Sequence, residues 1–324
     1  MHPVLYAVHR WVTQMQLLDF SRPVLLALST GPDSVFLYHY LKQVYTLDKL
    51  YCVYFNHQCR RPDALEPEIA YMMALKQAHP KTVFIREAPV RPPGIEVAAR
   101  KARYDQMQAI ARKHHITQVC TAHHYDDHIE TVLMKLIRGS QRGLGGIRPQ
   151  RPWPELGANG TLSRPLLQTP KAVIHAFLDE QAIAYCHDHT NNSRQFTRNR
   201  VRHDLIPLLT TLNPAIKSRL AAFAVQQAET QDFLAQHHQA LHTYITHHND
   251  YYQLSRHDLC SWPTVSQCYI IRVLADLVAT RDISYDHIRT VQTLCNRTRF
   301  PLYTQWPGGI QIHITRAYLR VACI

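Results

Sequence analysis

Residues 29–34 read Ser-Thr-Gly-Pro-Asp-Ser, a combination suited to holding a phosphate group and a metal ion. They follow an apolar run that ends at Leu28 and precede a helical apolar pattern. Backbone N–H groups at such a helix start, with the hydroxyl groups of Ser29 and Ser34, can donate to phosphate oxygens. A carboxylate does not bind phosphate, so Asp33 is better suited to the Mg²⁺ that neutralises a triphosphate. The alternative is an ordinary strand-to-helix turn in which these side chains are only caps.

A second segment, His123 to Thr131, contains two carboxylates at the expected start of a helix. Asp127 and Glu130 are three residues apart, so both project from one helix face. Such a pair can hold a metal ion or the ammonium group of a substrate. Two alternatives are open: acidic residues that only stabilise the first helical turn, and a zinc site, for which no further Cys or His ligand is placed nearby.

The third feature is a cluster of basic residues between positions 194 and 203. Arg198, Arg200 and Arg202 are suited to the phosphate backbone of RNA. Their alternating spacing does not place all of them on one helix face, so some must serve the structure instead.

The elements that position these segments alternate along the first half of the chain. Strand patterns at 24–28, 50–55, 82–86 and 118–122 alternate with helical patterns at 33–44, 66–77, 96–114 and from 127 onward. This order predicts an α/β fold, a Rossmann-like doubly wound parallel sheet. Residues 29–34, 56–61 and 123–130 directly follow strands, so we expect them to converge at the carboxyl edge of the sheet.

The second half of the chain has a different pattern. A Gly-, Pro- and Arg-rich loop is expected at 139–160, followed by helices at 170–181 and 199–209 and a long helix from 214 to about 245. Helical patterns at 264–278 and 285–295 precede strand-like runs at 301–305 and 310–322. We therefore predict two domains, 1–212 and 213–324, of which the second is smaller and mostly helical.

Composition limits the class of protein. The chain has 324 residues and a formal charge of +12, which favours a polyanionic partner such as nucleic acid. The eight cysteines form no Cys-x-x-Cys pair, as expected for reduced thiols in a cytoplasmic protein. No apolar run has membrane-spanning length, and the N-terminus lacks a secretory pattern.

The 29–34 loop resembles the pyrophosphate-binding loop of the N-type ATP pyrophosphatases, Ser-Gly-Gly-x-Asp-Ser, with Thr30 in place of a glycine. The resemblance implies that the loop binds ATP through the residues Ser29, Thr30, Gly31, Pro32, Asp33 and Ser34. It also implies that Asp33 holds Mg²⁺. A positive φ is unfavourable for threonine, so the sequence does not decide whether the backbone at position 30 adopts the conformation of a glycine.

Several further motifs, in the same order, resemble the tRNA(Ile)-lysidine synthetases. The motif from His123 to Thr131 matches their His-His-x-Asp-Asp-Gln-x-Glu-Thr, with His128 in place of Gln. The other matching segments are Arg138-Gly139-Ser140, Arg142-Gly143-Leu144, Asn56 to Arg60, Ile95 to Tyr104, Arg198 to Arg202 and Trp306-Pro307-Gly308-Gly309. The resemblance therefore covers nearly the whole chain, as a short form without the last C-terminal domain.

That resemblance implies an ATP- and Mg²⁺-dependent ligase that joins L-lysine to C2 of the wobble cytidine of tRNA(Ile) with a CAU anticodon. An adenylated cytidine is the intermediate. The implied catalytic residues are Asp33, Asp127, Glu130 and Arg100, and Asp127 and Glu130 also bind lysine. The implied tRNA-binding residues are Arg103, Arg138, Arg142, Arg198, Arg200 and Arg202. Family members are often homodimers, and no sequence pattern here decides the oligomeric state.

Two alternative functions remain at this stage. The first is a PP-loop enzyme of tRNA 2-thiolation, a chemistry that usually needs Cys-x-x-Cys pairs. The second is a tRNA-binding protein whose catalytic loop has decayed at Thr30. The carboxylates Asp33, Asp127 and Glu130 argue against decay, because a pure RNA binder has no use for acidic side chains that face RNA.

Overall fold

The computed structural model describes residues 1–56, 62–87, 95–139, 143–186, 196–278 and 283–322. The first helices are α1 (Pro3–Gln14), α2 (Pro32–Val44), α3 (Pro62–Ala78), α4 (Ile95–Lys113), α5 (Tyr125–Ile137), α6 (Lys171–Glu180), α7 (Thr197–Arg200) and α8 (Ile206–Leu212). The π-helical turn η3 (Val201–Leu205) joins α7 to α8, and the 3₁₀ turn η1 (Pro154–Leu156) lies between two strands. The strands of this part are β1 (Val24–Ala27), β2 (Leu50–Asn56), β3 (Val83–Glu87), β4 (Gln118–Cys120), β5 (Gln150–Pro152) and β6 (Thr161–Ser163).

The remainder of the chain begins with the long helix α9 (Ile216–His237) and the 3₁₀ turn η4 (Gln239–Tyr244). It continues with strands β7 (Ile245–His247) and β8 (Tyr251–Ser255) and helices α10 (Arg256–Ser261), α11 (Thr264–Leu277) and α12 (Tyr285–Cys295). It ends with strands β9 (Leu302–Trp306), β10 (Ile310–Ile314) and β11 (Tyr318–Ala322). Among the residues described, no helix is long and apolar enough to cross a membrane.

The chain folds into two compact units. The first consists of Met1–Val132 and Gly146–Ala221, and the second of Leu133–Gly145 and Ala222–Ile324. The break between them therefore falls within α9, and a short segment after α5 belongs to the second unit. The assignment of one unit to catalysis and the other to tRNA remains a prediction.

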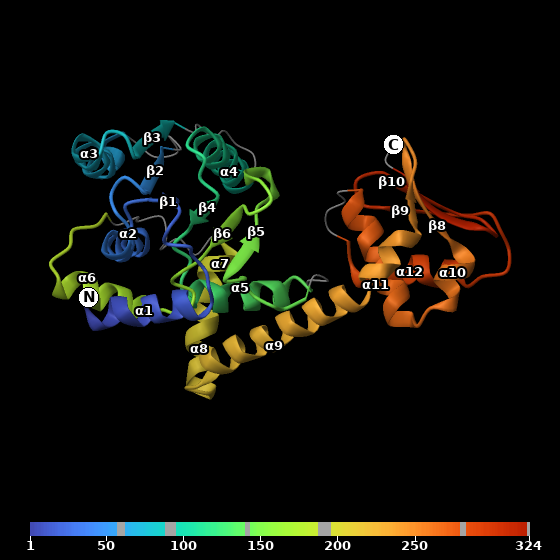
Figure 1. Ribbon diagram of the computed structural model, residues 1–324. Helices are drawn as coiled ribbons and strands as arrows, with labels where there is room; N and C mark the ends of the chain where they lie inside the picture. Colours follow the sequence, from blue (N-terminus) through green and yellow to red (C-terminus); the bar gives the residue numbers. More distant parts are fainter. Residues whose placement is uncertain (57–61, 88–94, 140–142, 187–195, 279–282, 323–324) are drawn as a thin grey trace. The chain divides into compact units, whose positions relative to one another are not determined.

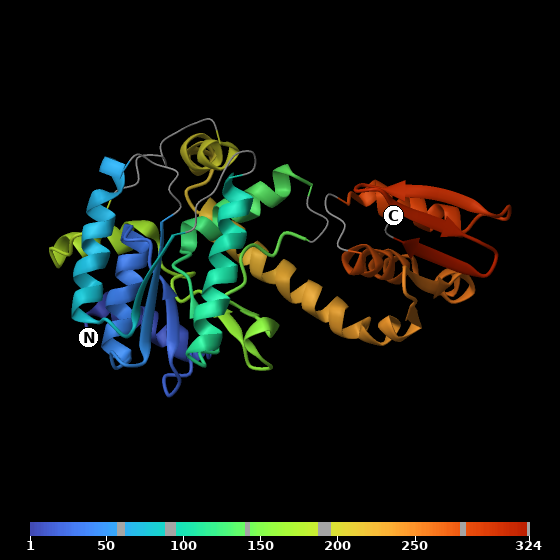
Figure 2. The same cartoon turned by 90° about the horizontal axis from the view of Figure 1, so that it is seen from above.

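The sheet of the first unit has the strand order β3-β2-β1-β4-β6-β5. Its first five strands are parallel, and only the edge strand β5 runs antiparallel to its neighbour β6. Helices lie on both faces of this sheet (Figure 2), which confirms the predicted α/β fold. Parallel strands require such crossover helices, and these bury both faces.

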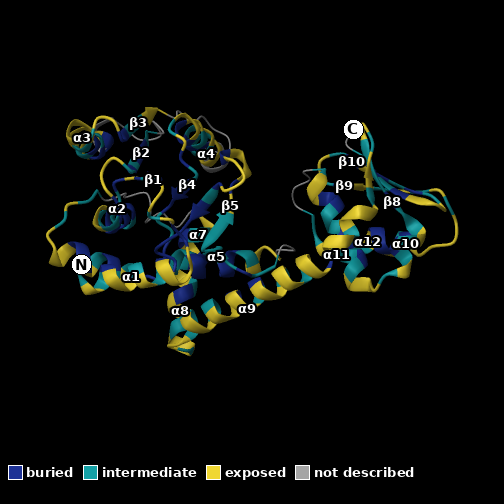
Figure 3. Ribbon diagram, viewed as in Figure 1, coloured by how far each residue is buried: buried dark blue, intermediate teal, exposed yellow. Residues whose placement is uncertain are grey.

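Alternation along β1 fixes which helices cover which face. Val24 and Leu26 point into the core formed with α1, α2 and α6, whereas Leu25 points into the core formed with α4. All three side chains are fully buried, in agreement with the buried ribbon of β1 in Figure 3. A strand that is apolar on both faces is what a central parallel strand requires.

Strand β1 has β2 on one side and β4 on the other, so the strand order reverses at β1. The loops after β1 and β4 leave the same edge of the sheet at this point. Open α/β sheets bind ligands at such a switch point, because the two diverging connections leave a crevice there. The topology therefore brings residues 29–34 and the start of 123–130 together, as the sequence predicts, whereas residues 57–61 of the third predicted segment lie outside the described residues.

The prediction of a mostly helical C-terminal domain is wrong. The second unit contains a five-stranded antiparallel sheet with the order β7-β8-β11-β10-β9, in addition to helices (Figure 1). The expected strand-like run at 310–322 is two strands that pair with each other in antiparallel register. Strands β7 and β8 are short. Strand β8 pairs with β11, far away in the sequence, and β7 pairs with β8.

Candidate active site

The loop after β1 has a threonine at a strained backbone position. Thr30 has φ of +62° and a fully buried side chain. Its hydroxyl donates to the Ser29 carbonyl at 2.6 Å, and the Cys186 N–H donates to the Thr30 carbonyl at 2.9 Å. A left-handed backbone costs a non-glycine residue about 1–2 kcal/mol. These two hydrogen bonds and the burial of the side chain oppose that cost.

The hydroxyl of Ser34 holds the two ends of this loop together. It accepts a hydrogen bond from the Ser29 N–H at 3.1 Å and donates to the Gly31 carbonyl at 3.0 Å. The Ser29 hydroxyl lies 3.1 Å from that of Ser34. Helix α2 begins directly afterwards, at Pro32, so the positive end of its dipole adjoins these hydroxyl groups. The arrangement suits the oxygens of a phosphate group.

His124 connects this loop to the acidic motif after β4. Its Nε2 atom lies 3.6 Å from Asp33 Oδ2 and 3.5 Å from Asp127 Oδ2. Its Nδ1 atom accepts from the Asp127 N–H at 3.3 Å, which leaves the ring proton on Nε2, between the two carboxylates. The His124 side chain is 2% exposed. Asp127 in return accepts a hydrogen bond from the His124 N–H at 3.1 Å, so it also caps α5. This agrees with the alternative in which the acidic residues stabilise the first helical turn.

Asp33 retains an oxygen that the protein does not satisfy. Burial raises the pKa of its carboxyl group, although His124 partly opposes that rise. Its Oδ1 atom is buried and has no hydrogen-bond partner in the described part of the chain. A buried carboxylate oxygen of this kind fits a Mg²⁺ ion, which takes oxygen ligands. No cluster of three or more metal-ligating side chains occurs among the described residues, so phosphate oxygens and water would complete the shell.

Two arginines bind the carboxylates of α5 directly. Arg202 donates to Glu130 Oε1 at 2.5 Å and to Oε2 at 3.0 Å. Arg198 donates to Glu130 Oε2 at 2.8 Å and to Asp127 Oδ1 at 2.9 Å. The Glu130 side chain is 1% exposed, so this is a buried, charge-assisted network. Burial opposes ionisation of Asp127, but His124 and Arg198 outweigh it and hold the pKa of Asp127 below its usual value.

The basic cluster therefore divides as its spacing requires. Arg198 and Arg202 are four residues apart and face the same glutamate, whereas Arg200, between them, is exposed. The π-helical turn begins at Val201, directly after Arg200. Such turns occur often at functional sites, because they change the direction in which side chains project.

The other predicted arginines lie in different places. Arg100 on α4 is exposed and donates to the Tyr104 hydroxyl at 3.1 Å, while Arg103 on the same helix is half-buried. Arg138 is exposed just beyond α5, in the second unit. Arg142 lies outside the described residues. The structure thus brings Asp33, Asp127, Glu130, Arg198 and Arg202 together in the first unit.

His128, which replaces the usual glutamine, fixes the backbone after the glycine-rich segment. Its Nδ1 atom accepts from the Ile147 N–H at 3.1 Å. Gly146 has φ of +62°, and a Cβ atom at that position would lie 2.3 Å from the His128 ring. Both features tie residues 146–147 closely to helix α5.

Sequence reasoning missed two residues beside this site. The pKa of His123 is lowered to about 4, chiefly by burial; Asp127 opposes the decrease, whereas nearby arginines, Arg164 first, contribute to it, so the ring is neutral at pH 7. Arg164 is 5% exposed and follows β6 directly. The signal for Arg164 was a single cation in the mostly apolar stretch from Leu162 to Leu167. Charged side chains are rarely buried without a partner, so this position could have been identified as a candidate site residue.

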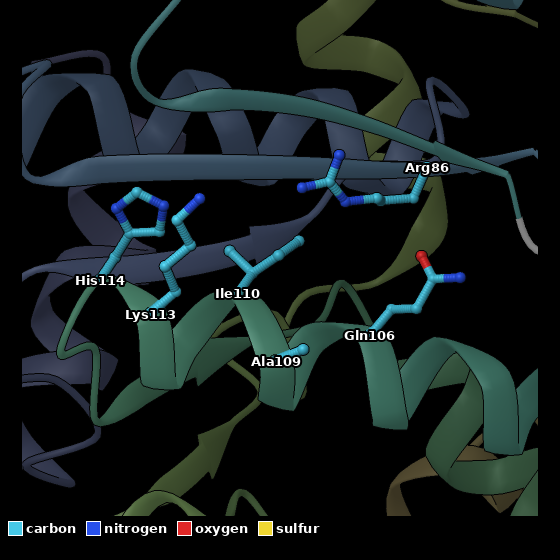
Figure 4. A pocket seen from close by; sticks show the side chains of 6 residues that line it. All are labelled: Arg86, Gln106, Ala109, Ile110, Lys113 and His114. Atoms are coloured by element: carbon cyan, nitrogen blue, oxygen red, sulfur yellow. The ribbon is translucent and has the colours of Figure 1, made fainter.

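A separate pocket lies between β3 and α4, away from this site (Figure 4). It has a volume of about 270 Å³ and is lined by Arg86, Gln106, Ala109, Ile110, Lys113 and His114. On α4, Gln106, Ala109, Ile110 and Lys113 follow Tyr104 at helical spacings that place them on roughly the opposite side of the helix. Burial lowers the pKa of His114, and Lys113 and Arg86 lower it further.

Comparisons with known proteins agree with this geometry. Residues 6–209 match the model of the PP-loop domain family. The chain is 35% identical to a tRNA(Ile)-lysidine synthase of Enterococcus faecalis over 65% of this chain and 46% of that protein. It is also 35% identical to one of Parabacteroides distasonis, over 70% of this chain and 51% of that protein.

The fold is also similar to a solved U34-tRNA thiolase of Methanococcus maripaludis. The TM-score is 0.53 at 13% identity, with 70% of this chain and 78% of that chain covered. This chain spans about half the length of the curated relatives it matches. Because the family model matches residues 6–209, which are more than half of the chain, the chain belongs to the PP-loop domain family.

Proposed function

We propose that this chain is an ATP-dependent ligase that joins L-lysine to C2 of the wobble cytidine of tRNA(Ile) with a CAU anticodon. The observation that carries the proposal is the contact of His124 with both Asp33 and Asp127. This contact places the proposed phosphate-binding loop next to a carboxylate pair that is suited to an ammonium group. A reaction that uses both ATP and an amine requires these two kinds of group at one site. The names of the relatives support the same reaction.

In this proposal the loop at 29–34 binds the β- and γ-phosphates of ATP. The cytidine O2 attacks the α-phosphorus, pyrophosphate leaves, and the cytidine becomes adenylated at O2. Hydroxyl and N–H groups of the loop then stabilise the charge that develops on the leaving pyrophosphate. Mg²⁺, held by Asp33, would supply further neutralisation of that charge.

The lysine ε-ammonium then loses a proton to water, and the neutral amine attacks C2. A C–N bond forms, and AMP leaves as the C2–O bond breaks. Asp127 and Glu130 bind the lysine ammonium in this proposal. Arg202 contacts both oxygens of Glu130, whereas Asp127 Oδ1 receives one short hydrogen bond, from Arg198. Asp127 is therefore the more available carboxylate, and an incoming ammonium would compete with Arg198 for it.

The cysteines favour this ligase over a tRNA thiolase. Cys52 and Cys120 are buried, and burial raises the pKa of both thiols, which makes them poor nucleophiles. The likeness to the solved thiolase concerns the fold alone. The Asp33–His124–Asp127 arrangement, in which a buried histidine lies between two partly exposed carboxylates, likewise favours an enzyme over a decayed RNA binder.

The test is incorporation of labelled lysine. The protein is incubated with ATP, Mg²⁺, labelled lysine and a tRNA(Ile) transcript with a CAU anticodon, beside tRNA(Met) as the control. We expect label only in the isoleucine tRNA, with release of pyrophosphate. Absence of label from both RNAs, with both RNAs bound, would contradict the proposal. Pyrophosphate release without lysine dependence would instead indicate thiolation or another adenylating reaction.

Several parts of the proposal rest on the resemblance alone. They are the tRNA contacts of Arg103, Arg138, Arg142 and Arg200, the catalytic role of Arg100, the formation of a homodimer and a cytoplasmic location. In this proposal residues 1–212 carry catalysis and residues 213–324 contribute to tRNA binding.

A further inference from the structure

Arg164 is a buried cation without a carboxylate partner. Its residue is 5% exposed, and NH1 donates to the Arg148 carbonyl at 2.6 Å. Its Nε atom is buried and has no hydrogen-bond partner, and no carboxylate among the described residues lies within ion-pair distance. Burying an unpaired charge is costly, so such residues usually face an anion.

The guanidinium groups of two more arginines lie over the ring of a neighbouring tyrosine. The guanidinium carbon of Arg100 lies 4.9 Å from the centre of the Tyr104 ring, and that of Arg151 lies 5.5 Å from it. Arg100 also donates to the Tyr104 hydroxyl at 3.1 Å. The three arginines come from α4, β5 and the segment after β6, all within the first unit. Elements far apart in the sequence thus bring three cations to one place.

The charges of this cluster oppose one another. The pKa of Arg164 is lowered to about 10, chiefly by burial; Arg151 and Arg100 contribute to the decrease, and Tyr104 partly opposes it. At neutral pH Arg164 still carries its charge. The free protein therefore holds three cations around Tyr104, and an anion would relieve their repulsion.

We propose that Arg100, Arg151 and Arg164, arranged around Tyr104, form a binding site for a phosphate group of a substrate. Planar guanidinium groups match phosphate oxygens in pairs. Arg164 and Arg100 also act on His123, which is adjacent in sequence to His124, so the site adjoins the carboxylates described above. The proposal rests on the proposed function, which supplies two phosphate sources: the α-phosphate of ATP and the backbone of the tRNA.

The experiment compares four variants of the full chain: Arg164→Gln, Arg164→Lys, Arg151→Gln and Arg86→Gln. Arg86 is the matched control. It is an arginine of β3 that lines the pocket of Figure 4, and this pocket lies on another side of α4 from Tyr104. Thermal unfolding of each variant establishes that it is folded. Affinity is then measured for ATP and, separately, for the tRNA(Ile) transcript over a range of salt concentrations.

We expect Arg164→Gln and Arg151→Gln to weaken one of the two ligands by about tenfold or more. If the source is tRNA, the slope of log affinity against log salt falls by about one for each lost phosphate contact, and ATP affinity stays unchanged. If the source is ATP, its affinity falls and the tRNA salt slope stays unchanged. Arg164→Lys retains part of the affinity, because it keeps the charge and loses the planar fork.

The proposal is overturned if Arg164→Gln and Arg151→Gln bind both ligands as the wild type does, or if Arg86→Gln has an equal effect. If Arg164→Gln does not fold, Arg164→Lys and Arg151→Gln decide between these outcomes. These experiments measure binding and not lysine transfer, so they test the phosphate site independently of the proposed ligase activity. If the wild-type protein transfers no lysine but Arg164→Gln weakens its binding of tRNA, the phosphate site is supported and the ligase function is contradicted.

Discussion

The Nε2 atom of His124 lies 3.6 Å from Oδ2 of Asp33, a contact that joins the first turn of α2 to the loop after β4. The two residues meet because β1 and β4 are neighbours in the sheet, with parallel register. The protonated Nε2 faces the carboxylate, whereas Asp33 Oδ1 has no partner among the described residues. One oxygen is thus fixed by the protein while the other is left for a ligand.

The first prediction concerns this free oxygen. We expect Asp33→Asn to lower the rate of pyrophosphate release by about 100-fold or more, because the substitution removes the charge that holds a cation at the phosphates. Stability should change little, because the amide replaces a carboxyl group whose pKa burial already raises. Rates are measured over a range of Mg²⁺ concentrations, with urea unfolding as the control. An Asn variant with wild-type Mg²⁺ dependence would show that Asp33 does not hold the metal.

The second prediction concerns Glu130. Glu130→Gln removes the charge that pairs with Arg198 and Arg202, so we expect the free energy of unfolding to fall by about 2 kcal/mol. Arg198 is 43% exposed, and this exposure reduces the loss. Glu155→Gln, an exposed residue of η1, is the control and should change stability very little. Equal unfolding midpoints in urea for both variants would contradict the importance of the network.

The same variant also tests lysine binding. If Glu130 positions the lysine ammonium, Glu130→Gln raises the lysine KM as well as lowering stability. A variant with reduced stability and an unchanged lysine KM would restrict Glu130 to holding the two arginines.

The third prediction concerns the backbone at Thr30. Thr30→Val keeps the side-chain shape but loses the hydrogen bond from the hydroxyl to the Ser29 carbonyl. We expect a loss of about 1 kcal/mol in the free energy of unfolding from that bond. Thr30→Ser retains the hydroxyl and is the matched control. The two variants are compared by urea unfolding, and a Val variant as stable as the wild type would show that the bond contributes nothing.

The fourth prediction concerns the close approach of His128 to residue 146. Gly146→Ala combines a positive φ with a Cβ atom 2.3 Å from the imidazole, so we expect it to cost about 2–3 kcal/mol. Gly139→Ala is the control, since Gly139 has φ of +59° and nothing within 4 Å of the added atom. It should cost only about 1 kcal/mol, the backbone part of the penalty.

A double variant separates the two contributions. Adding His128→Ala to Gly146→Ala removes the clash, so the pair should be less destabilising than the sum of the single changes. Simple additivity in urea unfolding would contradict a direct contact between the two residues.

The fifth prediction concerns pH. His123 has a pKa of about 4 in the folded protein and an ordinary value of 6.5 in the unfolded chain. Between these values the unfolded chain binds more protons, so stability rises with pH across this interval and falls as the medium is acidified. The slope from this residue approaches about 1.4 kcal/mol per pH unit.

His123→Asn should flatten that slope, whereas His257→Asn should not, because the His257 side chain is 93% exposed. Both are checked by urea unfolding at several pH values between about 4 and 7. An unchanged slope in the His123 variant would assign the acid sensitivity to other groups.

Local sequence signals were sufficient for the first unit's sheet and for the loop at its edge. Strand β1 is a continuous apolar run that stops at a polar loop, and α2 begins with Pro32 at its first position. These signals lie within a few residues of one another, so they can be read without knowing the partner elements. The approach of residues 29–34 to 121–127 followed from the general topology of parallel sheets.

Other features depended on contacts between distant segments. Only the tertiary structure pairs Arg198 and Arg202 with Glu130, although the sequence suggested RNA for the arginines and lysine for the glutamate. The tertiary structure likewise buries Arg164 near Tyr104, and it pairs strand β8 with the distant strand β11. The sequence by itself determined which residues form each local element and which chemical groups they carry. The tertiary structure decided which charges face one another, because burial and ion pairing depend on neighbours that are remote in the chain.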